Sequence, residues 1–175
     1  MRAIIPALAL LAASLAATPA AAQDGEGAQT RQQNPSGLPI PRWVSVRAGE
    51  ANLRTGPGAR YPIDWVLQRK DLPVEVVEEF ENWRKIRAPD ETVGWVHKSM
   101  LSGNRTATVA VARARVLSRP EDRAPIAAFV EEGVQVKLEF CEAEWCAVAI
   151  ESHGVEGWIP RAALWGLHDG EVVVR

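Results

Sequence analysis

The 175-residue chain has little of what catalytic and nucleic-acid-binding sites are usually made of. It has only two cysteines and three histidines, and its 20 Lys and Arg residues are outnumbered by 22 Asp and Glu residues. A net charge of −2, with no basic cluster, is not that of a nucleic-acid-binding protein. The histidines (His97, His153 and His168) are scattered, with no nucleophile–base pair or metal-ligand set around them. The composition therefore predicts no enzyme activity, no cofactor and no metal.

Long apolar runs are also scarce, and the one that stands out lies at the N-terminus. Arg2 precedes an apolar segment over residues 4–17, and Ala20-Ala21-Ala22 forms an Ala-x-Ala cleavage site. The segment is short for a membrane span and contains Pro6. We predict a signal peptide over residues 1–22, whose removal leaves a periplasmic or secreted protein without stable membrane insertion.

Residues 23–41 are rich in glycine, proline, glutamine and asparagine. Such a composition buries too little apolar surface to offset the entropy of ordering. We predict a disordered linker here, which acts as a stiff tether; the alternative is that its proline-rich end is a ligand for another module.

From Trp43 onward, short apolar runs alternate with turn residues, and no long helical pattern is present. The predicted strands cover residues 43–47, the surroundings of Leu53, and residues 63–67, 72–76, 83–87 and 92–96. Five or six short strands in some sixty residues are typical of a small closed barrel.

Two local features carry more detailed predictions. Gly56-Pro57-Gly58 predicts a type II turn with Gly58 at positive φ. Glu75 is expected on the wet face of its strand. Glu78, Glu79 and Glu81 are expected at an exposed hairpin tip, where no burial would raise their pKa values.

The same pattern returns after 62 or 63 residues, which indicates a duplication. The shift places Leu72, Val74 and Val76 on Val134, Val136 and Leu138, Trp83 on Trp145, and Gly94-Trp95-Val96 on Gly157-Trp158-Ile159. We predict a first barrel over residues 42–103, a second over 104–168 and a tail over 169–175. The recurring tryptophans are expected in the core or at the barrel closure, and the recurring glycines at a bulge or a close backbone approach.

Cys141 and Cys146 flank the hairpin turn of the second copy. Residues opposite each other in an antiparallel pair lie within disulfide distance, so an exported protein is expected to link them. A redox site and half a zinc site are the alternatives, but the Cys-x-x-x-x-Cys spacing is not the redox motif, and no paired histidine completes a zinc site.

Asn52-Leu53-Arg54-Thr55-Gly56-Pro57-Gly58, followed by Tyr61-Pro62-Ile63, Trp83 and Gly94-Trp95-Val96-His97, resembles bacterial SH3-like (SH3b) domains. The resemblance covers residues 44–101 well and 111–164 less well, because the second copy opens with Arg115-Val116-Leu117 instead of Asn-Leu-Arg. The whole layout resembles exported alphaproteobacterial-type proteins with two tandem SH3-like domains. The implied fold is all-β, with two small barrels after the signal peptide and linker. The implied function is non-catalytic binding of peptidoglycan or of an envelope protein.

Aromatic residues that the duplication does not repeat are candidates for ligand binding. These are Trp43, Tyr61, Trp65 and Trp165. Tyr61, Trp65 and Trp43, with Arg54 at a polar edge, are predicted to bind the ligand on the first barrel. The alternative is that Trp65 or Trp43 packs against the second barrel. At the level of the whole protein, the alternative to ligand recognition is a structural or assembly protein of the envelope that acts through protein–protein contacts only.

Overall fold

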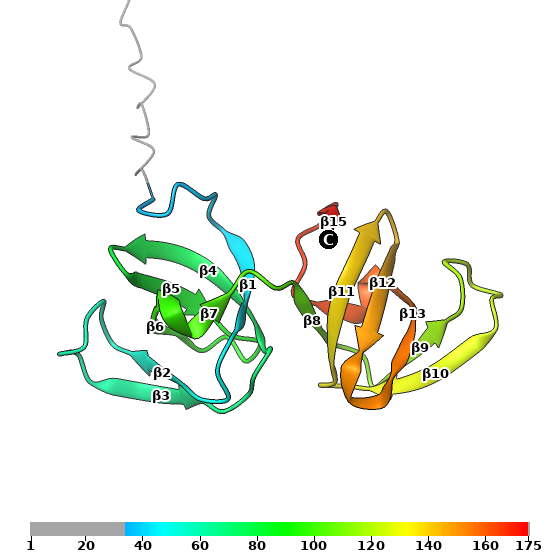
Figure 1. Cartoon of the computed structure of the whole chain (residues 1–175), viewed down its shortest axis with the longest axis horizontal. Coiled ribbons are helices and arrows are strands. Elements are labelled where there is room, and N and C mark those ends of the chain that lie inside the picture. The colour runs from blue at the N-terminus through cyan, green and yellow to red at the C-terminus, as the bar shows by residue number, and fades with distance from the viewer. Residues whose placement is uncertain (1–33, 175) are drawn as a thin grey trace, which may run out of the picture. The chain divides into compact units, whose positions relative to one another are not determined.

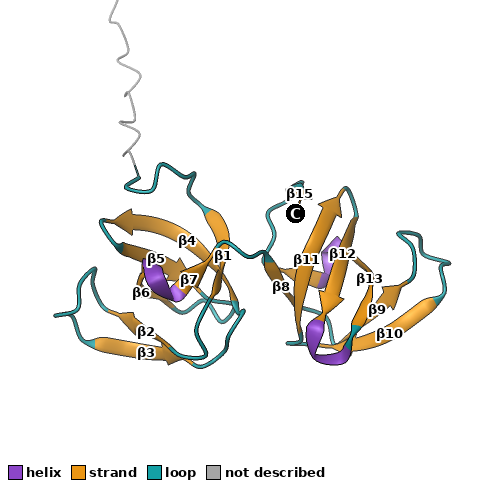
Figure 2. Ribbon diagram, in the orientation of Figure 1, coloured by secondary structure: helices purple, strands orange, loops and turns teal. Residues whose placement is uncertain are grey.

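The computed structural model describes residues 34–174, which form strands joined by turns and three single-turn 3₁₀ helices (Figures 1 and 2). The predicted signal peptide and linker residues 23–33 lie outside the described residues. None of the helices between residues 34 and 174 has the length and hydrophobicity of a membrane span.

The first half of the described chain forms a seven-stranded sheet of order β3-β2-β6-β5-β4-β1-β7. In chain order its elements are β1 (Arg42–Val46), β2 (Ala51–Arg54), β3 (Ile63–Leu67), β4 (Pro73–Phe80), β5 (Trp83–Arg87), β6 (Val93–His97), the 3₁₀ helix η1 (Lys98–Met100) and β7 (Leu101–Ser102).

The second half forms an eight-stranded sheet of order β10-β9-β13-β12-β11-β8-β14, with β15 paired to β11. Its elements are β8 (Thr106–Val109), β9 (Arg113–Leu117), β10 (Ile126–Glu131), β11 (Gln135–Glu142), β12 (Trp145–Ile150), η2 (Glu151–His153), β13 (Val155–Pro160), η3 (Arg161–Ala163), β14 (Leu164–Trp165) and β15 (Val173–Val174). Apart from β15, the strand order repeats that of the first half, so the predicted duplication is confirmed.

Each half has its own hydrophobic core, as expected of two separate barrels. Leu53, Val74 and Ile86 are among the fully buried residues of the first core, and Val116, Val136 and Val148 are among those of the second. Alternation along each strand turns these side chains inward. The all-β prediction of two tandem small barrels is confirmed.

The repeated tryptophans occupy equivalent positions in the two sheets. Trp83 follows the hairpin turn and lies opposite His97, and Trp145 follows the equivalent turn and lies opposite Pro160. Of the four recurring tryptophans only Trp95 is buried, at 8% exposure, whereas Trp83, Trp145 and Trp158 are half-buried. None of the four belongs to the hydrophobic core clusters of the described residues.

The predicted turn at Gly58 is wrong in its geometry, because the φ angle of Gly58 lies outside the left-handed range. The Gly58 amide donates to the Gly56 carbonyl over 2.9 Å, which makes a three-residue turn centred on Pro57. A Cβ atom on Gly56 would lie 2.5 Å from the ring of Tyr61. Glycine is needed at position 56 for this ring contact.

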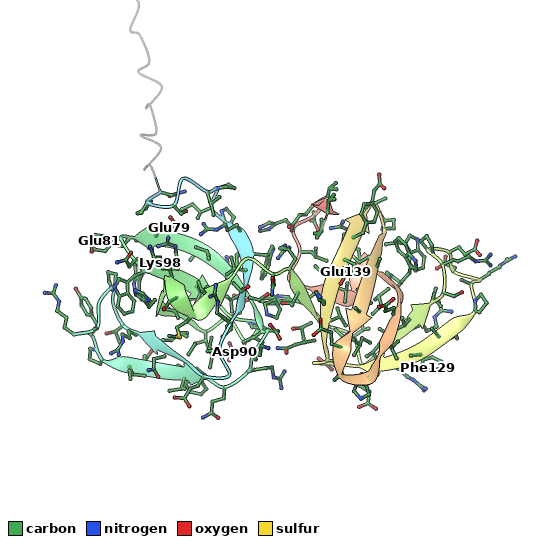
Figure 3. The ribbon with its side chains drawn as sticks, viewed as in Figure 1. Glu79, Glu81, Asp90, Lys98, Phe129 and Glu139 are labelled. Carbon is green, nitrogen blue, oxygen red and sulfur yellow. A yellow bond between two sulfur atoms is a disulfide. The ribbon has the colours of Figure 1, made fainter. Side chains whose placement is uncertain are left out.

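The expectation that the glutamates of β4 face solvent is wrong for two of them. Glu75 is 8% exposed and forms an ion pair with Arg87 at 2.8 Å. The side chain of Glu79 is fully buried and pairs with Arg42 at 2.6 Å and Arg84 at 3.0 Å. Glu79 lies near the β4–β5 turn (Figure 3). In both cases a segment distant in sequence supplies the cover, which the alternation within one strand cannot reveal.

The last part of the predicted linker, residues 34–41, has defined contacts with the first barrel. Ser36 donates its backbone amide (3.0 Å) and its hydroxyl (2.8 Å) to the Glu79 carboxylate. The Arg42 guanidinium donates to the Pro39 carbonyl over 3.2 Å. Composition predicted disorder for this stretch, but Ser36 is hydrogen-bonded to β4 and Pro39 to the first residue of β1.

The C-terminal segment, predicted as a tail over 169–175, is integrated into the second barrel as far as it is described. Val173 is 5% exposed and pairs with Cys141 in β11. Arg105 forms an ion pair with Glu171 at 2.7 Å and donates to the Gly166 carbonyl over 3.1 Å. Burial lowers the pKa of the Arg105 guanidinium, and Glu171 opposes this shift.

The predicted disulfide between Cys141 and Cys146 is present, and both residues belong to the second core. They are directly opposite each other on β11 and β12, with Cα atoms 4.2 Å apart.

Reduction of this disulfide is expected to lower the free energy of unfolding of the second barrel by about 2 kcal/mol, because the loop that it closes is short. Urea denaturation with and without dithiothreitol measures the difference. A Cys141→Ala/Cys146→Ala variant serves as the control and should not respond to the reductant. An equal loss of stability in the first barrel would contradict the assignment.

Candidate functional site

Two large apolar side chains are exposed on β3, the strand at one end of the first sheet. Trp65 is 54% exposed and Ile63 is 48% exposed. Among residues 34–174, β3 pairs with β2 on one side and with no strand on the other, so its other edge has backbone groups outside the ladder. Trp65 therefore lies exposed on an end strand of the first sheet.

The loop before β3 is built around Tyr61. Its ring lies against Gly56 and Gly58, and the guanidinium carbon of Arg60 is 5.2 Å from the ring centroid. Arg54 donates to the Tyr61 carbonyl over 2.7 Å, so it positions the loop from within. The hydrogen bond that Arg60 donates to the Tyr61 hydroxyl, and the charge interaction with Tyr61, raise the pKa of the Arg60 guanidinium. Burial opposes this shift.

The structure does not bring all four predicted site residues together. Arg54 lies on β2, Trp65 lies on β3, and Tyr61 lies in the loop that joins these two strands. Trp43 lies on β1, with its ring centroid 4.6 Å from that of Trp165 and 5.5 Å from that of His168. Trp43 therefore contacts the second half of the chain, as the alternative prediction had it, and is separate from the surface on β3.

Sequence reasoning missed an exposed aromatic residue on the second barrel. Phe129 is 50% exposed on β10, and the guanidinium of Arg113 lies 3.9 Å from its ring centroid (Figure 3). The signal was available, because Phe129 falls on Val66 in the repeat alignment and is thus an unrepeated aromatic residue.

A polar cleft of about 580 Å³ is lined by residues of both halves, among them Arg47, Lys70, Asp71, Gln135 and Glu151. Both charge signs are present. Its lining therefore favours neither an anionic nor a cationic ligand.

The sequence model of the bacterial SH3 domain matches residues 47–103 and 110–166. The chain belongs to the bacterial SH3 domain family. The two matches correspond to the two barrels, although β1 precedes the first match and β8 the second. The predicted resemblance is confirmed for both copies.

Among solved structures, the chain is similar to NlpC2 from Trichomonas vaginalis, with 16% identity and a TM-score of 0.33 over 73% of this chain and 49% of that one. It is also similar to an NlpC/P60 family protein from Bacillus cereus, with 13% identity and a TM-score of 0.32 over 70% of this chain and 55% of that one. The chain thus spans about half the length of these proteins. No curated protein matches it.

Proposed function

We propose that the mature protein is a non-catalytic, exported binding protein that recognises peptidoglycan through its first SH3 barrel. Membership of the bacterial SH3 domain family supports a binding role. The observation that carries the choice of surface is the exposed Trp65 on the free edge of β3. The buried disulfide and the predicted signal peptide support a periplasmic or secreted location.

The chemistry of this surface suits peptidoglycan in two ways. The indole face of Trp65, which is 54% exposed, provides apolar area on which a sugar ring or the apolar side of a stem peptide can lie. The free backbone groups of β3 can pair with an extended peptide. Tyr61 and Arg54 hold the loop that opens onto this strand, so they contribute to the surface through its shape.

Sedimentation with purified sacculi tests the proposal. Trp65→Ala is expected to weaken binding by about tenfold or more, as loss of a central aromatic contact does, and Tyr61→Ala to weaken it through the loop. Phe129→Ala is the matched control, because Phe129 is an aromatic residue of similar exposure on the second barrel. Equal retention of the wild type and the Trp65→Ala variant would remove the proposed surface.

The second candidate is a structural or assembly protein of the envelope that acts by protein–protein contacts only. Trp43 favours it, because the contact with Trp165 joins the two halves of the chain instead of meeting a ligand. This function predicts no retention on sacculi and an envelope protein that co-purifies with the wild-type chain.

A further inference from the structure

In the first barrel, the chain's own lysine covers the ring of Trp95. Lys85 lies directly opposite Trp95 across β5 and β6, and its Nζ atom is 5.9 Å from the centroid of the indole ring. The same ammonium group is 3.3 Å from a carboxylate oxygen of Glu78. An aromatic face and a carboxylate therefore hold an ammonium group at this place, and Trp95 is only 8% exposed.

The equivalent place in the second barrel has the tryptophan but not the lysine. Ala147 lies opposite Trp158 across β12 and β13, as Lys85 lies opposite Trp95. Phe140 stands opposite Ala147, where Glu78 stands opposite Lys85, and its ring packs edge-on against Trp158 with the centroids 6.4 Å apart. Alanine does not reach across the ring as Lys85 does, and a hollow of about 440 Å³ lies beside Trp158. Its lining residues are Ser118, Glu139, Ala147, Val148, Glu156, Gly157 and Trp158.

The carboxylates at the hollow stand at other positions than Glu78 of the first barrel, whose counterpart is Phe140. Glu156 lies opposite Ala149 and takes the position that Val93 has opposite Arg87. Glu139 occupies the irregular position of β11, which corresponds to Val77 in β4 (Figure 3). Lys137 lies 3.6 Å from Glu139 and offsets part of its charge, whereas Glu156 is exposed. The charged residues that line the hollow are both carboxylates.

We propose that this hollow binds the ammonium group of a ligand with a primary amine on an apolar stem, such as a lysine-type side chain. The ligand's ammonium group takes the place over Trp158 that Lys85 takes over Trp95 in the first barrel. The indole face, Glu156 and Glu139 attract the positive charge of the ammonium group. The apolar stem of the ligand lies against the ring of Trp158. The site is on the second barrel and is independent of the surface around Trp65.

The probe for this site is Nα-acetyl-lysine methylamide, titrated into the ¹⁵N-labelled mature protein. Saturable shifts are expected at the amide of Gly157 and the indole N–H of Trp158. The matched ligand is Nα-acetyl-norleucine methylamide, which has an apolar stem but no ammonium group and should cause no saturable shift there. Equal responses to both ligands would overturn the proposal.

Two variants make the test specific. Ala147→Lys supplies a covering lysine from the chain itself, so binding should be about tenfold weaker or lost, although no group of the site has been removed. Glu156→Gln should weaken binding by about threefold, while Glu144→Gln, an exposed carboxylate at the hairpin turn, should leave it unchanged. If both Ala147→Lys and Glu156→Gln bind the probe like the wild type, the proposal is wrong. Because Glu156 is exposed, its variant tests the site even if Ala147→Lys does not fold.

Discussion

Replacement of Gly157 with alanine is expected to destabilise the second barrel by about 3 kcal/mol or more. A Cβ atom at this position would lie 2.6 Å from both the carbonyl oxygen of Leu117 and Cγ1 of Val116. Leu117 is the residue of β9 that pairs with Trp158 of β13. The carbonyl is part of the backbone there, so it cannot move aside without disturbing the pairing of β9 with β13.

Gly94 is the matched control, because it occupies the equivalent position in the first barrel. The atoms nearest to an added Cβ atom there would be Cβ, Cγ and Cδ2 of Leu53, at 3.0 to 3.2 Å. Because these contacts are several tenths of an ångström longer than those at Gly157 and need only a small shift of β2, Gly94→Ala is expected to cost less, about 1 kcal/mol. Thermal unfolding followed by circular dichroism measures both variants. Equal losses of stability would show that the close approach to Leu117 is not what requires glycine at position 157.

The repeat was the most informative feature of the sequence, because it connects residues that are distant along the chain. It correctly related Trp83 to Trp145 and Gly94 to Gly157, and the strand predicted over residues 63–67 is β3 as observed. These predictions succeeded because alternation, turns and glycines act within one strand or hairpin.

Predictions about exposure were less successful, since exposure depends on segments far away in the chain. Glu75 follows the alternation that should place it in solvent, yet the ring of His168, 93 residues later, lies 3.8 Å from its carboxylate. Composition likewise favoured disorder for Ser36, and only the fold shows that it hydrogen-bonds Glu79. Neither contact has a local signal in the sequence.

At the candidate site, too, the sequence identified candidate residues but did not predict which of them are exposed. The rule that unrepeated aromatic residues are available for binding identified Trp65 and, applied fully, identifies Phe129, and both are exposed. The same rule also identified Trp43, which packs against Trp165. Repetition shows that a barrel can do without a residue, but it does not distinguish a ligand contact from a contact between the two halves.

Removal of the Glu79 side chain is expected to destabilise the first barrel by about 3 kcal/mol. Arg42 and Arg84, whose side chains are 16% and 7% exposed, would then be left without their carboxylate. Ser36 would lose both of its hydrogen bonds to β4. Urea denaturation of a Glu79→Ala variant measures the loss. The control is Glu78→Ala, which removes an exposed carboxylate paired with Lys85 and should cost about 1 kcal/mol or less.

The pH dependence of stability distinguishes the charge of Glu79 from its packing. Burial alone would raise the pKa of the Glu79 carboxyl, but the hydrogen bonds from Ser36 and the charge of Arg42 bring it below its ordinary value of 4.5. Because the unfolded chain then takes up the proton first on acidification, the contribution of the charge is complete above the ordinary pKa. It is lost as the pH falls through the lowered pKa of the folded state. The difference in free energy of unfolding between the wild type and Glu79→Gln should therefore be constant above about pH 5 and shrink in more acidic buffer. If the difference stayed constant down to pH values at which Glu79 is protonated in both the folded and the unfolded state, Glu79 would act through its shape and not through its charge.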